Sequence, residues 1–395
     1  MVVGAAILLW QRPWSGDATS TPVPVPSDAD ELLTDQIGAL GAASSRAELR
    51  EAAGPGERAR AWADATWAAR RDLGVGDVAW RYVDGGQAAD RADGTVTARV
   101  EVAWRPVRGS VLGTGPRQES TVALRLAPTR SGGFAVRSVS RDDGALPPWL
   151  AGPVRVVGAE GATVVEIDGG VPDRDLVAQA RTASRQVRAI LPETSGRLVV
   201  LAPASQRVAA GLLDRPVSQV RDIAAVTTTL DSTARTSPVV VLNPSVYASM
   251  DERASQVVMT HEATHLLSAS VGRDVPAWVA EGFADYVALA RDRAPLSVSA
   301  GQVLRQVDDG DLPARLPTEQ DFASATHLGA VYESAWLAFR LLDERYGERR
   351  VVGFYDSVLG GTSLERALDD SFGLGEASLT RLWRAYLTKM ASTVS

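Results

Sequence analysis

The feature that most restricts the fold is a pair of histidines four residues apart, His261 and His265, inside a stretch predicted to be helical from Glu252 to Ser270. Residues four apart project from the same side of an α-helix, so one metal ion can contact both imidazoles. Glu262 directly follows the first histidine, where its carboxylate can reach a water molecule beside the ion and act as a general base. Only three histidines occur in the chain, so chance explains the pattern poorly. The alternative is a helix with two histidines that binds no metal.

A catalytic zinc ion needs a third protein ligand, and the segment from Pro276 to Tyr286 offers one. Glu281 lies sixteen residues after His265, which lets the chain turn and pack a second helix against the first. Asp285 follows one helical turn later, where it can accept a hydrogen bond from the free nitrogen of a ligating histidine. We therefore predict one Zn2+ ion held by His261, His265 and Glu281. Alternatively, Glu281 only caps or charges an exposed helix.

Together, the two segments resemble a known family. A His-Glu-x-x-His helix followed by the Trp-x-x-Glu-Gly-x-Ala-Asp-Tyr pattern of Trp278–Tyr286 is similar to the gluzincin zinc peptidases. The likeness is greatest to the small bacterial peptidase MA-like group and more distant to thermolysin, and it covers roughly residues 151–395. It implies a peptide or protein substrate, which a metal-activated water hydrolyses with Glu262 as the base. Metzincins are disfavoured because their third histidine would fall at Val271 and their glycine at Ser268.

Peptide hydrolysis also calls for a hydrogen-bond donor to the oxyanion that forms on the attacked carbonyl. Two candidates are close in sequence, His327 and Tyr332. Tyr332 is favoured because its segment resembles the tyrosine-bearing helix of peptidase MA-like proteins. A surface histidine at a helix start and a tyrosine packed in the core are the alternatives.

The apolar strand predicted at Val239–Leu242, just before the first helix of the motif, is a candidate sheet edge on which an extended peptide could pair. No Gly-x-Met-Glu-Asn type segment for capturing a substrate amine is present. By resemblance, this favours an endopeptidase over an aminopeptidase.

The order of predicted elements indicates an α+β fold with two parts. Residues 28–150 read as helices followed by four alternating strands, and they resemble the cone-shaped ketosteroid-isomerase-like (cystatin-like) domains. The prolines in Leu146–Trp149 suggest a boundary there. Residues 151–395 are expected to form a zincin-like domain, with a mixed sheet, then the two motif helices and a helical C-terminal part.

Composition and the first residues bear on partners and location. A net charge of -7 without a basic stripe disfavours nucleic acid, and the lack of cysteine excludes disulfides and thiolate ligands. Residues 1–12 are mainly apolar but shorter than the about 20 residues of a membrane span, and a Pro/Ser/Thr-rich linker follows at 13–27. We expect a truncated transmembrane or signal segment, and thus a single membrane anchor with the folded part extracytoplasmic, or secretion. A frayed N-terminus on a cytosolic protein is the alternative. Membrane contact is expected only here, and no oligomeric state is predicted.

Three functions compete for these features. The favoured one is an envelope-tethered endopeptidase, in which every catalytic role has a candidate. The second is a catalytically silent interaction module of the cell envelope with the same fold, which the presence of Glu262 disfavours. The third is a purely structural metal site, which usually has four ligands, commonly cysteines.

Overall fold

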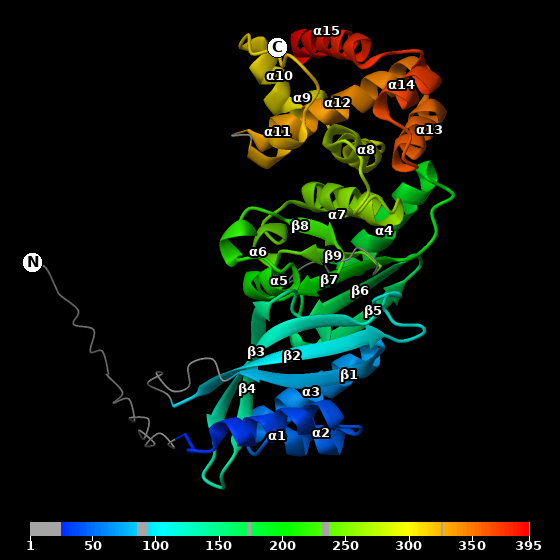
Figure 1. Ribbon diagram of the computed structural model, residues 1–395. Coiled ribbons are helices and arrows are strands. Elements are labelled where there is room, and N and C mark those ends of the chain that lie inside the picture. Colours follow the sequence, from blue (N-terminus) through cyan, green and yellow to red (C-terminus); the bar gives the residue numbers. More distant parts are fainter. Residues whose placement is uncertain (1–24, 85–93, 172–174, 231–236, 325–326, 395) are drawn as a thin grey trace, which may run out of the picture.

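The computed structural model describes residues 25–84, 94–171, 175–230, 237–324 and 327–394 (Figure 1). The fold is α+β, with a four-stranded antiparallel sheet, a five-stranded mixed sheet and a helical C-terminal part. This confirms the fold class predicted from the sequence. The expected membrane or signal segment at 1–12 and most of the linker at 13–27 lie outside the described residues. Among the described helices, none has the length and apolar character needed to cross a lipid bilayer.

The N-terminal part packs three helices against a sheet with strand order β1-β2-β3-β4, in which all neighbours are antiparallel. Its elements are α1 (Ala29–Ala42), α2 (Arg46–Ala52), α3 (Glu57–Leu73), β1 (Val75–Asp84), β2 (Val96–Pro106), β3 (Gln118–Pro128) and β4 (Phe134–Asp143). Alternate residues of the strands, such as Val100, Val122 and Leu124, are fully buried, as the period of two requires for a sheet with one covered face. All four strands were predicted.

The second sheet has the order β5-β6-β7-β9-β8 and follows a short 3-10 turn, η1 (Pro148–Leu150). Its strands are β5 (Val154–Ala159), β6 (Ala162–Ile167), β7 (Leu198–Pro203), β8 (Ala225–Thr228) and β9 (Val239–Leu242). The three middle strands are parallel, whereas β5 and β8 run antiparallel to their neighbours. β5 was not predicted, because its apolar residues are interrupted by Arg155 and Gly158.

The prediction that the strand Val239–Leu242 forms an edge of the sheet is wrong. This strand, β9, lies between β7 and β8, so the edge beside the motif helices is β8. All four β9 side chains are fully buried, since both faces of the strand are covered and both of its long sides are paired. A continuous apolar run is typical of such an interior strand.

The five-stranded sheet lies in the middle of the molecule (Figure 1). Successive residues of its strands point to opposite faces. Val164, Val200 and Val240 join a cluster with the helices that follow, while Val165, Leu201 and Val241 join one with the N-terminal part. Side chains from both sides of residue 150 therefore share the second cluster, and a domain division at that position stays a prediction.

The remaining elements are helices. Ala209 and Leu212 of one of them pack with the N-terminal part, while most of the others cover the opposite face of this sheet or build the C-terminal part (Figure 1). They are α4 (Leu176–Ile190), α5 (Gln206–Leu212), η2 (Val217–Gln219), α6 (Pro244–Tyr247), α7 (Glu252–Leu267), α8 (Ala277–Leu289), α9 (Leu296–Ser299), α10 (Gly301–Asp308), α11 (Glu319–Ser324), α12 (Leu328–Tyr346), α13 (Glu348–Leu359), α14 (Leu364–Phe372) and α15 (Glu376–Val394).

Helices α8 and α12 approach closely at Gly282. A Cβ atom there would lie 2.7 Å from the Ala335 carbonyl oxygen and 2.9 Å from a ring carbon of Phe339. We expect Gly282→Ala to lower the free energy of unfolding of the metal-free protein by about 1–3 kcal/mol, since overpacking forces the helices apart. Gly353, exposed within α13 with no atom near its would-be Cβ, is the matched control. Gly353→Ala should raise stability by about 0.5–1 kcal/mol in denaturant titrations. Equal stability of the two variants would contradict this packing.

Candidate metal centre

Helix α7 presents the first half of the motif to a cleft. Its N-terminus is capped by Asp251, whose carboxylate accepts a hydrogen bond from the Ala254 amide at 2.7 Å. Met259 and Ala263 are fully buried on the side that packs on the sheet and α4. The helical period turns His261 and His265 toward α8 instead.

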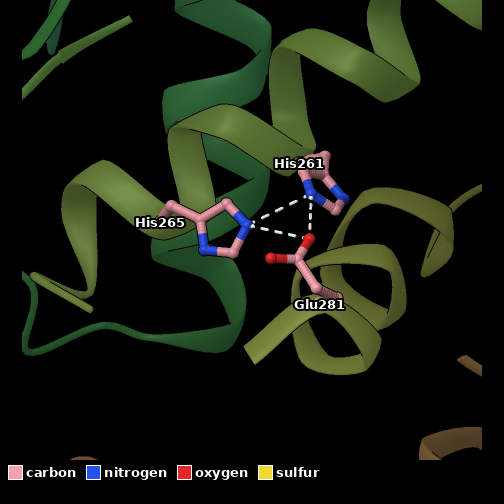
Figure 2. Close-up of side chains that lie close together, drawn as sticks. All are labelled: His261, His265 and Glu281. Carbon is pink, nitrogen blue, oxygen red and sulfur yellow. Dashed lines mark hydrogen bonds and ion pairs between the residues drawn. The ribbon is translucent and has the colours of Figure 1, made fainter. Parts of the chain in front are cut away.

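Helix α8 brings the third side chain to the same point (Figure 2). Glu281 Oε2 lies 3.1 Å from His261 Nε2 and 3.5 Å from His265 Nε2. The two Nε2 atoms are 3.1 Å apart. The structure therefore brings together the three side chains that the sequence singled out, with one nitrogen or oxygen atom of each facing a common point.

These separations fit a tetrahedral zinc ion. Bonds of about 2.0–2.1 Å at tetrahedral angles place ligand atoms about 3.3–3.4 Å apart. The three observed distances of 3.1, 3.1 and 3.5 Å bracket that value. Two imidazole nitrogens and one carboxylate oxygen also form a donor set that zinc commonly takes in enzymes, with a fourth position left for water or substrate.

The other nitrogen of each imidazole is already engaged. Asp285 Oδ1 lies 2.8 Å from His261 Nδ1, and Ser270 Oγ lies 3.2 Å from His265 Nδ1. A carboxylate accepts the Nδ1 proton, and a hydroxyl can accept it too, so each ring, in its neutral form, is held as the tautomer whose Nε2 carries a lone pair. That is the form a metal ion requires.

The charges around the three atoms also suit a cation. Burial lowers the pKa of the His261 imidazole, but the carboxylates of Asp285 and Glu281 outweigh it and raise that pKa well above its usual value. For Glu281, burial raises the pKa of the carboxyl, yet hydrogen bonds from His261 and His265 bring it far below its usual range. Two carboxylates thus provide negative charge at a largely buried point, and a divalent cation is well placed to balance it.

A cleft of about 510 Å3 opens beside His261. Glu262 and Tyr332 line it, as do His261 and Asp285. The Thr227 hydroxyl on β8 donates to Glu262 Oε2 at 2.6 Å, which holds the carboxylate between the sheet edge and α7. The Tyr332 ring lies 5.9 Å from the His261 ring, centroid to centroid.

The two oxyanion candidates lie on different faces of the start of α12. Tyr332 shares the cleft with Leu328, one helical turn earlier. His327 is exposed and lines a neighbouring cavity of about 480 Å3 with Arg315 and Val331. His327 is the N-cap residue of α12 and has a non-helical backbone, so its side chain does not follow the helical spacing that places Tyr332.

Comparison with known proteins gives likenesses to solved structures alone. No protein-family model matches the chain, and no curated protein matches it. A variant of an M1 zinc metallopeptidase from Deinococcus radiodurans, bound to a Tyr-Ser-Ala substrate, is 13% identical with a TM-score of 0.36, over 79% of this chain and 70% of its own. Two-domain M1 zinc metallopeptidase variants bound to L-tryptophan and to L-arginine are 12% and 13% identical, with TM-scores of 0.33 and 0.34. They match over 79% of this chain and over 69% and 83% of their own lengths.

Sequence reasoning missed Thr227 and Ser270. Nothing in the sequence around Thr227 indicates its role. That role depends on β8 being the edge strand, and the strand order follows from pairing between segments far apart in the sequence. Ser270 lies just after α7, where the chain turns through Ala269 with a φ of 56°. Glycine is the usual residue in that conformation. Because alanine stands there instead, the sequence did not indicate this turn.

Proposed function

We propose that the chain is a zinc-dependent peptidase that hydrolyses peptide bonds, with His261, His265 and Glu281 as the metal ligands. The observation that supports this best is the convergence of three ligand atoms whose imidazole partners are already hydrogen-bonded at Nδ1. Such an arrangement gives a site that is prepared for an ion and open on one side to a cleft. A structural zinc site is usually closed by a fourth protein ligand.

Glu262 is the proposed general base. When bound, Zn2+ would polarise the scissile carbonyl and make a water molecule acidic enough to lose its proton near neutral pH. Glu262 takes that proton as the water attacks and then delivers it to the leaving amine. The hydrogen bond from Thr227 keeps the Glu262 carboxylate in a single orientation while the proton moves.

Tyr332 is the proposed donor to the oxyanion. Burial raises the pKa of its hydroxyl well above the usual value, and the carboxylates of Glu281, Asp285 and Glu262 raise it further. The phenol therefore keeps its proton over the working pH range and can donate it in a hydrogen bond. A preorganised donor of this kind stabilises negative charge as it develops on the carbonyl oxygen.

Strand β8 is the proposed binding edge for the substrate. Among the described strands it pairs only with β9. The Asn243 amide donates to the Ala224 carbonyl, so by the antiparallel alternation the backbone groups of Ala225 and Thr227 point away from β9. An extended peptide can pair with these groups. Cleft residues nearby are largely apolar (Ile223, Met250, Val257, Val258 and Leu328), which favours a substrate with an apolar side chain there.

Replacing Tyr332 by Phe should lower kcat by about 100- to 1,000-fold, as removal of an oxyanion donor does in other enzymes. KM and zinc content should change little, since the ring and its packing remain. His327→Ala is the matched control and should keep the activity of the wild type. Steady-state kinetics with a quenched fluorescent peptide measure both variants, and a larger loss in His327→Ala would reverse the assignment.

The function itself is tested with the purified, zinc-loaded protein and an unfolded protein such as casein. We expect cleavage inside the casein chain, loss of cleavage with a chelator and recovery when zinc is returned. One bound zinc ion without turnover on casein or a broad peptide panel would instead support the silent interaction module.

We also propose that the chain is anchored to the cell membrane by its N-terminus, with the folded part extracytoplasmic. The apolar composition of 1–12 and the Pro/Ser/Thr-rich composition of 13–27 support this. Fractionation of cells that express the gene should place the protein in the envelope. Recovery in the cytosol would refute the proposal.

A further inference from the structure

The end of α7 folds back over its own second histidine. The Ser270 amide donates to the His265 carbonyl at 3.2 Å, across Ala269 in the left-handed conformation. This is the hydrogen bond of a Schellman turn, which closes many helices. The turn also places Ser270 Oγ 3.2 Å from His265 Nδ1 and 3.4 Å from the His265 carbonyl oxygen. The Ser270 hydroxyl can thus donate to the carbonyl while it accepts the imidazole proton.

A tyrosine from a distant helix contacts this turn. Tyr355, on α13, is fully buried, and its hydroxyl lies 2.9 Å from Ser268 Oγ. The Tyr355 ring stacks on Phe283 of α8, with 3.8 Å between centroids and an angle of 11° between planes. Phe283 comes two residues after Glu281 on α8. Tyr355 therefore contacts both motif helices, the end of α7 through Ser268 and α8 through Phe283.

The two imidazoles therefore have different kinds of hydrogen-bond partner at Nδ1. His261 is held by the charged carboxylate of Asp285, which needs no further orientation to accept a proton. His265 is held by a neutral hydroxyl, which can rotate about its C–O bond. Its orientation is fixed by the His265 carbonyl, to which Ser270 donates, and by the turn itself, which Tyr355 holds through its hydrogen bond with Ser268.

We propose that Ser270 and Tyr355 form a positioning pair that holds the His265 imidazole in its metal-binding orientation, so that α13 helps to set the zinc affinity of the site. The pair rests on the proposed metal site but not on peptidase activity. Partners that orient a ligating histidine typically account for about a 10- to 100-fold change in metal affinity.

The test measures zinc affinity by competition with a chromophoric chelator, without substrate. Ser270→Ala should weaken zinc binding by about 10- to 100-fold, and Tyr355→Phe should weaken it by a smaller factor because the ring still stacks on Phe283. The double variant should bind about as well as Ser270→Ala alone, since both changes act on one imidazole. Tyr286→Phe is the matched control, because it also removes the hydroxyl of a buried tyrosine, one that lines a cavity with Asp343. Its zinc affinity should equal that of the wild type.

Thermal unfolding with and without zinc separates positioning from general stability. A positioning role lowers the zinc-induced rise in Tm, which follows the affinity. A purely structural role lowers the Tm of the metal-free protein and leaves that rise unchanged. Zinc affinities of Ser270→Ala and Tyr355→Phe equal to that of the wild type would overturn the pair. A wild type that binds no zinc would overturn the metal site and the pair with it, whereas zinc binding without peptidase activity would overturn only the enzymatic function.

Discussion

Glu262→Gln is expected to lower kcat by about 100- to 10,000-fold, the range that general bases contribute, while the protein keeps its zinc. An amide has nearly the shape of a carboxylate, and its oxygen can still accept the hydrogen bond from Thr227. It cannot take a proton from the attacking water. The fold and the three ligands should therefore persist while turnover is lost. Zinc content and kcat on the same preparation measure both halves of the prediction.

Asp222→Asn is the matched control for this change. Asp222 is an exposed carboxylate that lines the same cleft, so the substitution removes the same charge from the same cavity without touching the motif. It should retain most of the wild-type kcat. If Glu262→Gln were as active as Asp222→Asn, another group would have to be the base.

Glu281→Ala should have the largest effect on the metal itself. It removes one of three ligand atoms and a carboxylate that balances the cation. We expect zinc affinity to fall by more than the about 100-fold that an orienting partner can account for, with peptidase activity falling alongside it. Dialysis against a chelator buffer followed by metal analysis measures the change.

Glu319→Gln is the control for the charge near α8. The Glu319 carboxylate accepts a hydrogen bond from the Ala277 amide at the start of that helix, but it is not a candidate ligand. Removing the Glu319 charge should change zinc affinity by about fivefold or less, which is the size of effect that exposed electrostatic interactions have. Full zinc occupancy in Glu281→Ala would show that a different side chain completes the site.

The parts of the site that could be predicted are those fixed by helical spacing. His261, Glu262 and His265 lie within one helix, and Glu281 and Asp285 lie one turn apart on the next. Their relative placement follows from 3.6 residues per turn, which the sequence displays directly. The alternating strands of the N-terminal sheet were predictable for the same reason, with a period of two.

The parts that could not be predicted depend on contacts between distant segments. The strand order that makes β8 the edge requires β9 to be inserted between β7 and β8, and nothing in Val239–Leu242 indicates which neighbours it takes. Likewise, Tyr355 meets Ser268 87 residues away along the chain. His327 precedes α12 with a non-helical backbone, so helical spacing could not place it relative to Tyr332 either.

An X-ray absorption spectrum at the zinc edge of the zinc-loaded wild type is the most direct test of the metal centre. We expect one ion per chain, bound by nitrogen and oxygen donors at about 2.0–2.1 Å, with the scattering pattern of two imidazoles. A protein that retains no zinc after gel filtration, or a spectrum without two imidazole ligands, would contradict the proposal that α7 and α8 together form a metal site.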